Sequence, residues 1–134
     1  MNKVKLKIAS NRKIADKVYE MRLLGDVGET KAGQFVEISV PNLYLRRPLS
    51  VCDSSADALT VVYKVVGKGT EIMSGLVVGE ELDVLTGLGN GYDLSASGNR
   101  PLLVGGGVGV PPLYKLCKEL TAQGKRPTVV LGFN

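Results

Sequence analysis

Apolar and polar residues alternate along most of the first ninety positions, which is typical of strands with one buried face. Val4, Leu6 and Ile8 alternate with lysines at the intervening positions. Residues 70–76 predict one or two turns of helix, with Thr70 as N-cap and the acidic Glu71 in the first turn. Further strands, separated by turn residues, are predicted over residues 17–24, 34–40, 45–51, 59–66 and 81–85. Six short strands and one small helix predict a closed antiparallel barrel.

The pattern changes after a small polar linker that begins at Ser95. A short apolar strand over residues 101–104 precedes a glycine-rich loop, and a second apolar strand is predicted over residues 128–131. Between them lies an amphipathic helix with apolar residues at i, i+3, i+4 and i+7, ended by a C′ glycine at Gly124; the apolar positions are Leu113, Leu116, Cys117 and Leu120. Strand, glycine loop, helix and strand form a βαβ unit.

The predicted fold is therefore mainly β: a six-stranded antiparallel barrel over residues 1–96, followed by the start of an α/β nucleotide-binding domain over residues 97–134. A parallel sheet needs helices on both of its faces, and two strands with one helix do not provide them. We therefore expect the 134 residues to be a fragment of a longer protein.

Composition narrows the possible functions. The net charge of +4 is spread thinly and only 5% of residues are aromatic, which argues against a nucleic-acid partner. No apolar run is long enough to span a membrane and the N-terminus does not resemble a signal peptide, so we expect a cytoplasmic protein without a membrane partner. Cys52 and Cys117 are the only cysteines and the chain has no histidine, so a metal site is not expected. No catalytic residue is predicted, and a bound cofactor must supply any chemistry.

The glycine-rich loop is the first candidate binding site. Gly106, Gly107 and Gly109 lie between a strand and a helix, where backbone amides can approach a phosphate. The spacing is not that of the G-x-G-x-x-G dinucleotide fingerprint. The alternative interpretation is that the glycines only allow the helix and the strand to pack closely.

Two further segments carry candidate residues. The segment LRRPLSV contains two adjacent arginines, one of which we expect to face an anion or a partner, because a buried unpaired Arg is costly. Two solvated arginines are an equal alternative. In the second segment, Tyr63 can bind a ring or ribose, and Gly69 and Thr70 can bind a phosphate. The alternatives are that Tyr63 fills the core and that the Gly-x-Gly-Thr segment is only a capped turn.

Four segments together resemble a known family: GQFVEISVPN (33–42), LRRPLSV (45–51), GLGNGY (87–92) and GGGVGVPPLYKL (105–116). They are similar to the electron transfer subunit of bacterial dihydroorotate dehydrogenase, within the wider ferredoxin reductase-like superfamily. The likeness extends over essentially the whole chain. The resemblance implies an FAD-binding barrel and an NAD-binding α/β domain, with the flavin between them.

The resemblance also implies roles for individual residues. Arg47, Pro48, Leu49 and Ser50 match the flavin motif, with Arg47 on the pyrophosphate and Ser50 near the isoalloxazine. Tyr63, Lys64 and Val65 match a second flavin strand. Gly69 and Thr70 match a phosphate-binding turn, and Gly106, Gly107 and Gly109 match the NAD loop. The family usually has Arg at the position of Lys64. The lysine keeps the positive charge but lacks the planar fork of a guanidinium group.

Full-length relatives add a [2Fe-2S] cluster, whose cysteines are absent from this sequence. They are expected to pass electrons between NAD and a dihydroorotate dehydrogenase catalytic subunit, in pyrimidine biosynthesis. Two alternatives stay open at this stage. The chain can be a different ferredoxin-NAD(P) reductase-type subunit, or a truncated module that binds flavin or a partner without turnover.

Overall fold

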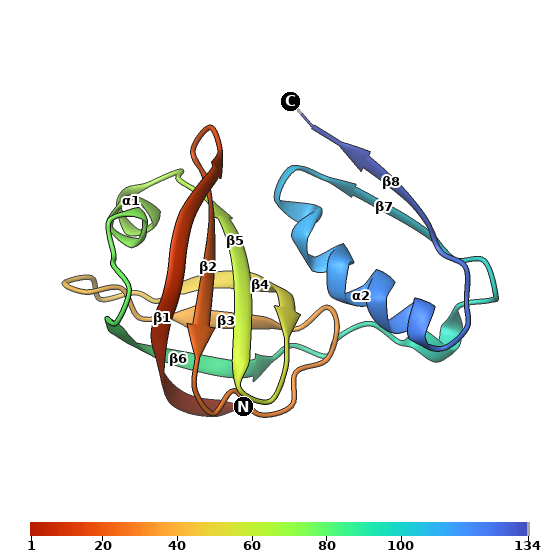
Figure 1. Ribbon diagram of the computed structural model, residues 1–134, viewed down its shortest axis with the longest axis horizontal. Coiled ribbons are helices and arrows are strands. Elements are labelled where there is room, and N and C mark those ends of the chain that lie inside the picture. Colours follow the sequence, from red (N-terminus) through yellow and green to blue (C-terminus); the bar gives the residue numbers. More distant parts are fainter. Residues whose placement is uncertain (134) are drawn as a thin grey trace.

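The computed structural model describes residues 1–133, so Asn134, the last residue of the predicted second domain, lies outside the described residues. It contains a β-barrel and a smaller α/β unit that lie side by side (Figure 1). In chain order, the elements are β1 (Asn2–Ala15), β2 (Val18–Leu24), β3 (Phe35–Ile38), β4 (Arg47–Ser54), β5 (Ala58–Lys64), α1 (Lys68–Ser74), β6 (Glu81–Leu88), the 3-10 turn η1 (Leu94–Ala96), β7 (Leu102–Gly106), the 3-10 turn η2 (Gly107–Gly109), α2 (Pro111–Ala122) and β8 (Thr128–Gly132).

The barrel is closed, with the strand order β1-β2-β5-β4-β3-β6 and antiparallel pairing throughout. The predicted barrel is therefore confirmed. The alternation in β1 has the predicted consequence, because Leu6 and Ile8 are buried while Lys5 and Lys7 are exposed. Closure pairs both edges of every strand over at least part of its length.

Helix α1 begins two residues earlier than the sequence pattern predicts. Gly67 is the N-cap and Thr70 lies at the third helical position, so the prediction of Thr70 as N-cap is wrong. The physical reason is that the Thr70 hydroxyl accepts hydrogen bonds from the backbone N–H groups of Val66, at 2.9 Å, and Gly67, at 3.2 Å. Thr70 thus stabilises the start of α1 from inside the helix. Glu71 lies in the first turn, as predicted.

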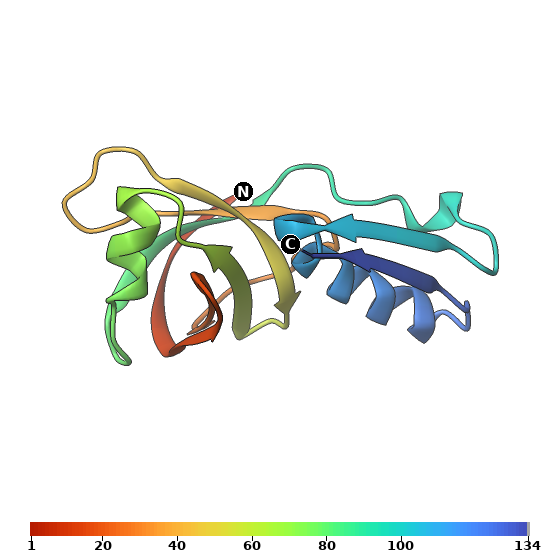
Figure 2. The ribbon, with the colours of Figure 1, turned by 90° about the horizontal axis from the view of Figure 1, so that it is seen from above.

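The second unit is the predicted βαβ unit. Strands β7 and β8 are parallel, and α2 covers one face of the pair (Figure 2). Leu103 of β7 packs in a small core against the predicted apolar stripe of α2, at Leu113, Leu116 and Leu120. Gly124 follows the helix with φ +80°, as expected of a C′ glycine. Within residues 1–133, no helix combines the length and the apolar character needed to cross a membrane.

Candidate functional site

The two adjacent arginines have different surroundings. Arg46 donates to an Asp83 carboxylate oxygen at 2.7 Å and to the Asp83 backbone carbonyl at 3.2 Å. The Arg46 hydrogen bond lowers the pKa of Asp83. Arg47, half-buried at the start of β4, donates to the Leu45 carbonyl and takes part in no ion pair among residues 1–133. Of these two arginines, Arg46 is therefore a structural residue, and Arg47 is the one whose charge has no acidic partner in the described chain.

The Arg47 side chain lies directly against the first turn of α1. A Cβ atom added at Gly69 would come within 2.0 Å of the Arg47 Nε atom, so only glycine allows this approach. The structure thus brings together two predicted segments that are more than 20 residues apart in the sequence. The Thr70 hydroxyl also donates to the Gly67 carbonyl at 3.1 Å, so it is occupied within the turn. What this turn offers a ligand is the guanidinium and the backbone amides at the helix start.

Strands β4 and β5 separate on the side where this turn lies. They pair only at Val51, Asp53 and Ser54 of β4, whereas the preceding residues 47–50 pair with β3 alone. Residues 62–64 of β5 pair only with β2. The wall of the barrel therefore opens between the two predicted flavin segments. Backbone groups on the facing edges of this opening can accept or donate hydrogen bonds to a ligand. Pro48, which lacks an N–H group, lies in this locally open part of β4.

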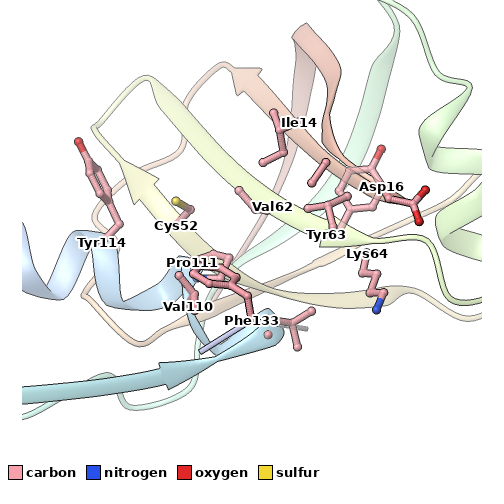
Figure 3. A pocket seen from close by; sticks show the side chains of 14 residues that line it. Ile14, Asp16, Cys52, Val62, Tyr63, Lys64, Val110, Pro111, Tyr114 and Phe133 are labelled. Carbon is pink, nitrogen blue, oxygen red and sulfur yellow. The ribbon is translucent and has the colours of Figure 1, made fainter. Parts of the chain in front are cut away.

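A pocket of about 510 Å³ lies between the barrel and the α/β unit (Figure 3). The barrel side of its wall is formed by the β1–β2 hairpin, β4 and β5. The other side is formed by the glycine loop, the start of α2 and the end of the chain. The lining residues are Ile14, Ala15, Asp16, Val18, Cys52, Val62, Tyr63, Lys64, Gly107, Val108, Val110, Pro111, Tyr114 and Phe133. The wall is mostly apolar, with Asp16 and Lys64 as its charged members.

Lys64 links this pocket to the turn at α1. The side chain is exposed and also borders a second, more open hollow, which Lys17, Val65, Val66, Gly67 and Glu71 line as well. The two hollows share Lys64, and the second one reaches Gly67, the N-cap of α1. A long ligand can therefore contact the pocket, Lys64 and the α1 turn at the same time.

Tyr63 borders the pocket, but its ring belongs to the barrel core. The ring is buried and stacks on Tyr19 at a centroid distance of 5.8 Å, and the hydroxyl donates to Asn11 Oδ1 at 2.8 Å. Burial is the main cause that raises the Tyr63 pKa to about 12. The ring is therefore part of the barrel core, as the alternative interpretation holds, while Tyr63 also borders the pocket, and its contact with a ligand stays a prediction.

The remaining predicted residues of the two strands differ in exposure. Pro48 and Ser50 are exposed, while Leu49 and Val65 are half-buried and pack against the barrel core. Of the lining residues named above, only Tyr63, Lys64 and Gly107 were predicted as site residues. No local sequence signal marks the others as one site, because the barrel residues meet Val110, Pro111 and Tyr114 only through the placement of α2 beside the barrel.

The glycines of this loop fall into two groups, one for each of its interpretations: close packing of helix and strand, and approach to a nucleotide. A Cβ atom at Gly105 would lie 2.6 Å from Leu113 Cδ1 and 3.1 Å from the Gly109 carbonyl oxygen, so this glycine serves close packing. At Gly106, Gly107 and Gly109, an added Cβ would meet nothing within 4 Å, so these three border open space. They are the residues predicted to approach a nucleotide.

Helix α2 itself offers few amides to a ligand. Pro111 and Pro112 occupy its first two positions and have no N–H group, and the Leu113 N–H donates to the Val110 carbonyl at 3.0 Å. A phosphate at this end would depend on the amides of residues 106–109 and on the helix dipole. The first helical turn cannot supply the donors that commonly hold phosphates at helix starts.

Sequence comparison identifies relatives over nearly the whole chain. The dihydroorotate dehydrogenase B (NAD(+)) electron transfer subunit of Bacillus pumilus is 48% identical over 142 residues, covering 99% of this chain and 55% of that protein. The subunit of the same name from Streptococcus mutans is 44% identical, covering 98% of this chain and 54% of that protein. The chain thus spans about half the length of the curated relatives that it matches. No family model matches it.

Solved structures show the same architecture. An NADH-dependent reduced ferredoxin-NADP oxidoreductase, described for flavin-based electron bifurcation, is 36% identical with a TM-score of 0.86, covering 96% of this chain and 48% of that one. Phthalate dioxygenase reductase is 25% identical with a TM-score of 0.83, covering 98% of this chain and 43% of that one. The ferredoxin reductase of carbazole 1,9a-dioxygenase, at 20% identity and a TM-score of 0.88 over 99% and 43% of the two chains, supports the fold alone.

Proposed function

We infer that this chain belongs to the dihydroorotate dehydrogenase B electron transfer subunit family and binds FAD between its barrel and its glycine loop. In this proposal, residues 1–96 are the FAD-binding barrel and residues 97–134 are the first βαβ unit of an NAD-binding domain. The chain passes electrons between NAD and a dihydroorotate dehydrogenase catalytic subunit. In full-length relatives, this route continues through a [2Fe-2S] cluster.

One observation carries the proposal: the barrel wall opens between β4 and β5, next to the apolar pocket and the Arg47–Gly69 contact. A flavin dinucleotide has an apolar ring system at one end and an anionic pyrophosphate further along, so it needs these two environments in one groove. In this proposal the flavin ring lies in the pocket and the dinucleotide extends past Lys64 toward the start of α1.

The residues of the α1 turn suit the pyrophosphate. Arg47 offers a planar fork of donors that matches phosphate oxygens and has no competing acid in the described chain. The backbone amides at the start of α1 point out of the helix, and Lys64 adds a positive charge along the path. In this proposal, the guanidinium, the backbone amides and Lys64 all compensate the two negative charges of the pyrophosphate.

The pocket suits the ring. Val62 and Cys52 offer an apolar barrel surface, and the exposed hydroxyl of Ser50 lies on the neighbouring segment of β4. Gly107 and Val108 face the pocket from the other side, so a nicotinamide held by the glycine loop would lie over the flavin. Bound FAD supplies the hydride and single-electron chemistry, so the chain needs to bind, orient and shield it, without an acid or base of its own.

The names of the relatives support a proposal for the partner. We propose a catalytic dihydroorotate dehydrogenase subunit as partner and a role in pyrimidine biosynthesis, consistent with these names. We also propose a cytoplasmic location. The 36% identity with a ferredoxin-NADP oxidoreductase favours a ferredoxin reductase-type subunit as the second candidate. Co-purification with a dihydroorotate dehydrogenase catalytic chain would support the first candidate, and reduction of ferredoxin by the isolated complex would support the second.

Flavin binding is tested on the chain itself. The purified protein is mixed with FAD, freed of excess cofactor by gel filtration, and examined by visible absorption. We expect a stoichiometric flavin spectrum with shifted and structured bands, as for a ring moved from water into an apolar pocket. A folded protein, verified by circular dichroism, that elutes without flavin at every FAD concentration tested would refute the proposal.

A further inference from the structure

Two lysines of α2 join this helix to the end of β4. Lys118 Nζ lies 2.8 Å and 2.9 Å from the two carboxylate oxygens of Asp53. Lys115 Nζ donates to the Ser54 carbonyl at 3.3 Å and forms an ion pair with Glu119 at 3.3 Å. The contacts with Asp53 and Ser54 connect residues more than 60 positions apart, across the boundary between the barrel and the α/β unit.

Lys115 is only 8% exposed, which is unusual for a lysine. Placing an ammonium group in such a position costs free energy unless hydrogen bonds and an opposite charge compensate it, and Ser54 and Glu119 provide both. The Asp53 hydrogen bond also raises the pKa of Lys118, because the carboxylate favours the charged form of the lysine. The two lysines therefore make a specific joint between the units, in addition to apolar contact.

A β-bulge directs this part of β4. The register with β5 shifts between Val51 and Asp53, so Cys52 has no partner in the ladder and lines the pocket, while Asp53 reaches Lys118. Bulges near binding sites commonly redirect side chains in this way. One strand thus carries the predicted flavin motif at its start, a pocket residue in its middle and the joint at its end.

We propose that Lys115 and Lys118 are positioning residues, which hold the glycine loop at a fixed distance across the pocket from β4. The inference rests on the proposed function: the loop would hold the nicotinamide and β4 the flavin. Because α2 begins directly after Gly107–Gly109 and cannot bend easily, fixing its side against β4 fixes the loop at its end. The two lysines act through the loop and contact neither cofactor.

The test uses Asp53→Asn, Lys118→Met and the double variant, all in the chain as it exists. The first readout is hydrogen exchange of residues 105–113, measured by mass spectrometry without FAD. The second is iodide quenching of the fluorescence of bound FAD. We expect each single variant to speed exchange in this segment about two- to fivefold, the effect of losing one partly exposed ion pair, and to increase quenching.

The direction in which each single variant changes the quenching distinguishes loss of the lysine contacts from a purely electrostatic effect of the altered charge. Asp53→Asn removes a negative charge and Lys118→Met a positive one, so a field acting on the pocket would shift the quenching in opposite directions, whereas a broken joint shifts it in the same direction. Relative to the unmodified chain, the effect of the double variant should be smaller than the sum of the two single effects, because both single variants remove the same contact. Lys118→Arg should restore slow exchange.

Arg12→Met is the matched control, because it removes a partly exposed ion pair with Glu20 on the β1–β2 hairpin and leaves the contacts of Lys115 and Lys118 in place. It should leave exchange of residues 105–113 unchanged. Unchanged exchange in both Asp53→Asn and Lys118→Met, or quenching that moves in opposite directions, would overturn the proposal. Exchange is read without cofactor, so failure of the chain to bind FAD would refute the proposed function without being mistaken for failure of the joint.

Discussion

Replacement of Arg47 by Met tests the FAD site most directly. Methionine keeps an unbranched apolar stem against Gly69 and removes the guanidinium. Charge-assisted hydrogen bonds contribute about 1.5 to 3 kcal/mol, which corresponds to a roughly 10- to 150-fold weaker affinity for FAD. Thermal stability should change little, since Arg47 forms no ion pair among residues 1–133.

The neighbouring arginine provides the matched control. Arg46→Gln breaks the 2.7 Å contact with Asp83 on the barrel and should lower the melting temperature, with FAD affinity retained within a few-fold. Affinity is measured by flavin fluorescence titration at fixed ionic strength, because screening weakens contacts to phosphate. Equal FAD affinities for Arg47→Met and the unmodified chain, or a larger loss in Arg46→Gln, would show that the pyrophosphate has been assigned to the wrong arginine.

Three further predictions concern the fold and the pocket. Gly105→Val should destabilise the α/β unit by about 1 to 3 kcal/mol in thermal unfolding, because its side chain would collide with Leu113 and the loop backbone; an unchanged melting temperature would contradict this packing. The hydrogen bond from Arg46 lowers the Asp83 pKa, so its stabilising effect is present at neutral pH and lost as pH falls through that lowered pKa; Asp83→Asn should give a flatter acid unfolding curve by circular dichroism. Burial, helped by nearby carboxylates, raises the Cys52 pKa to about 11, so alkylation of Cys52 by iodoacetamide, followed by mass spectrometry, should keep accelerating above pH 9 and slow when FAD is bound.

Local patterns were sufficient for the elements and the fold class. The alternation of Leu6 and Ile8 with lysines and the i, i+3, i+4, i+7 stripe of α2 each reflect one buried face, which a strand or helix shows in its own sequence. Errors fell at the ends of elements. Helix α1 starts before Thr70 because its hydroxyl bonds backward to amides that precede the helix, and a propensity for capping does not specify that direction.

The candidate site depended more on tertiary structure. Motif likeness marked Arg47, Gly69 and the glycine loop, but adjacent arginines have identical local chemistry, and only the position of Asp83 on β6 separates Arg46 from Arg47. Likewise, the sequence left Tyr63 between a ligand contact and a core residue. Its place in the barrel core and its hydrogen bond to Asn11, 52 residues away, became visible only in the tertiary structure.

The sequence alone therefore determined the barrel, the βαβ unit and the segments that bear the motifs, because periodicity and turn chemistry act over a few residues. Only the tertiary structure decided that β4 and β5 part beside the motif, that α2 is joined to β4 by two lysines, and that a pocket lies between the units. Each of these features arises from contacts between residues far apart in the chain, and no local pattern encodes such a contact.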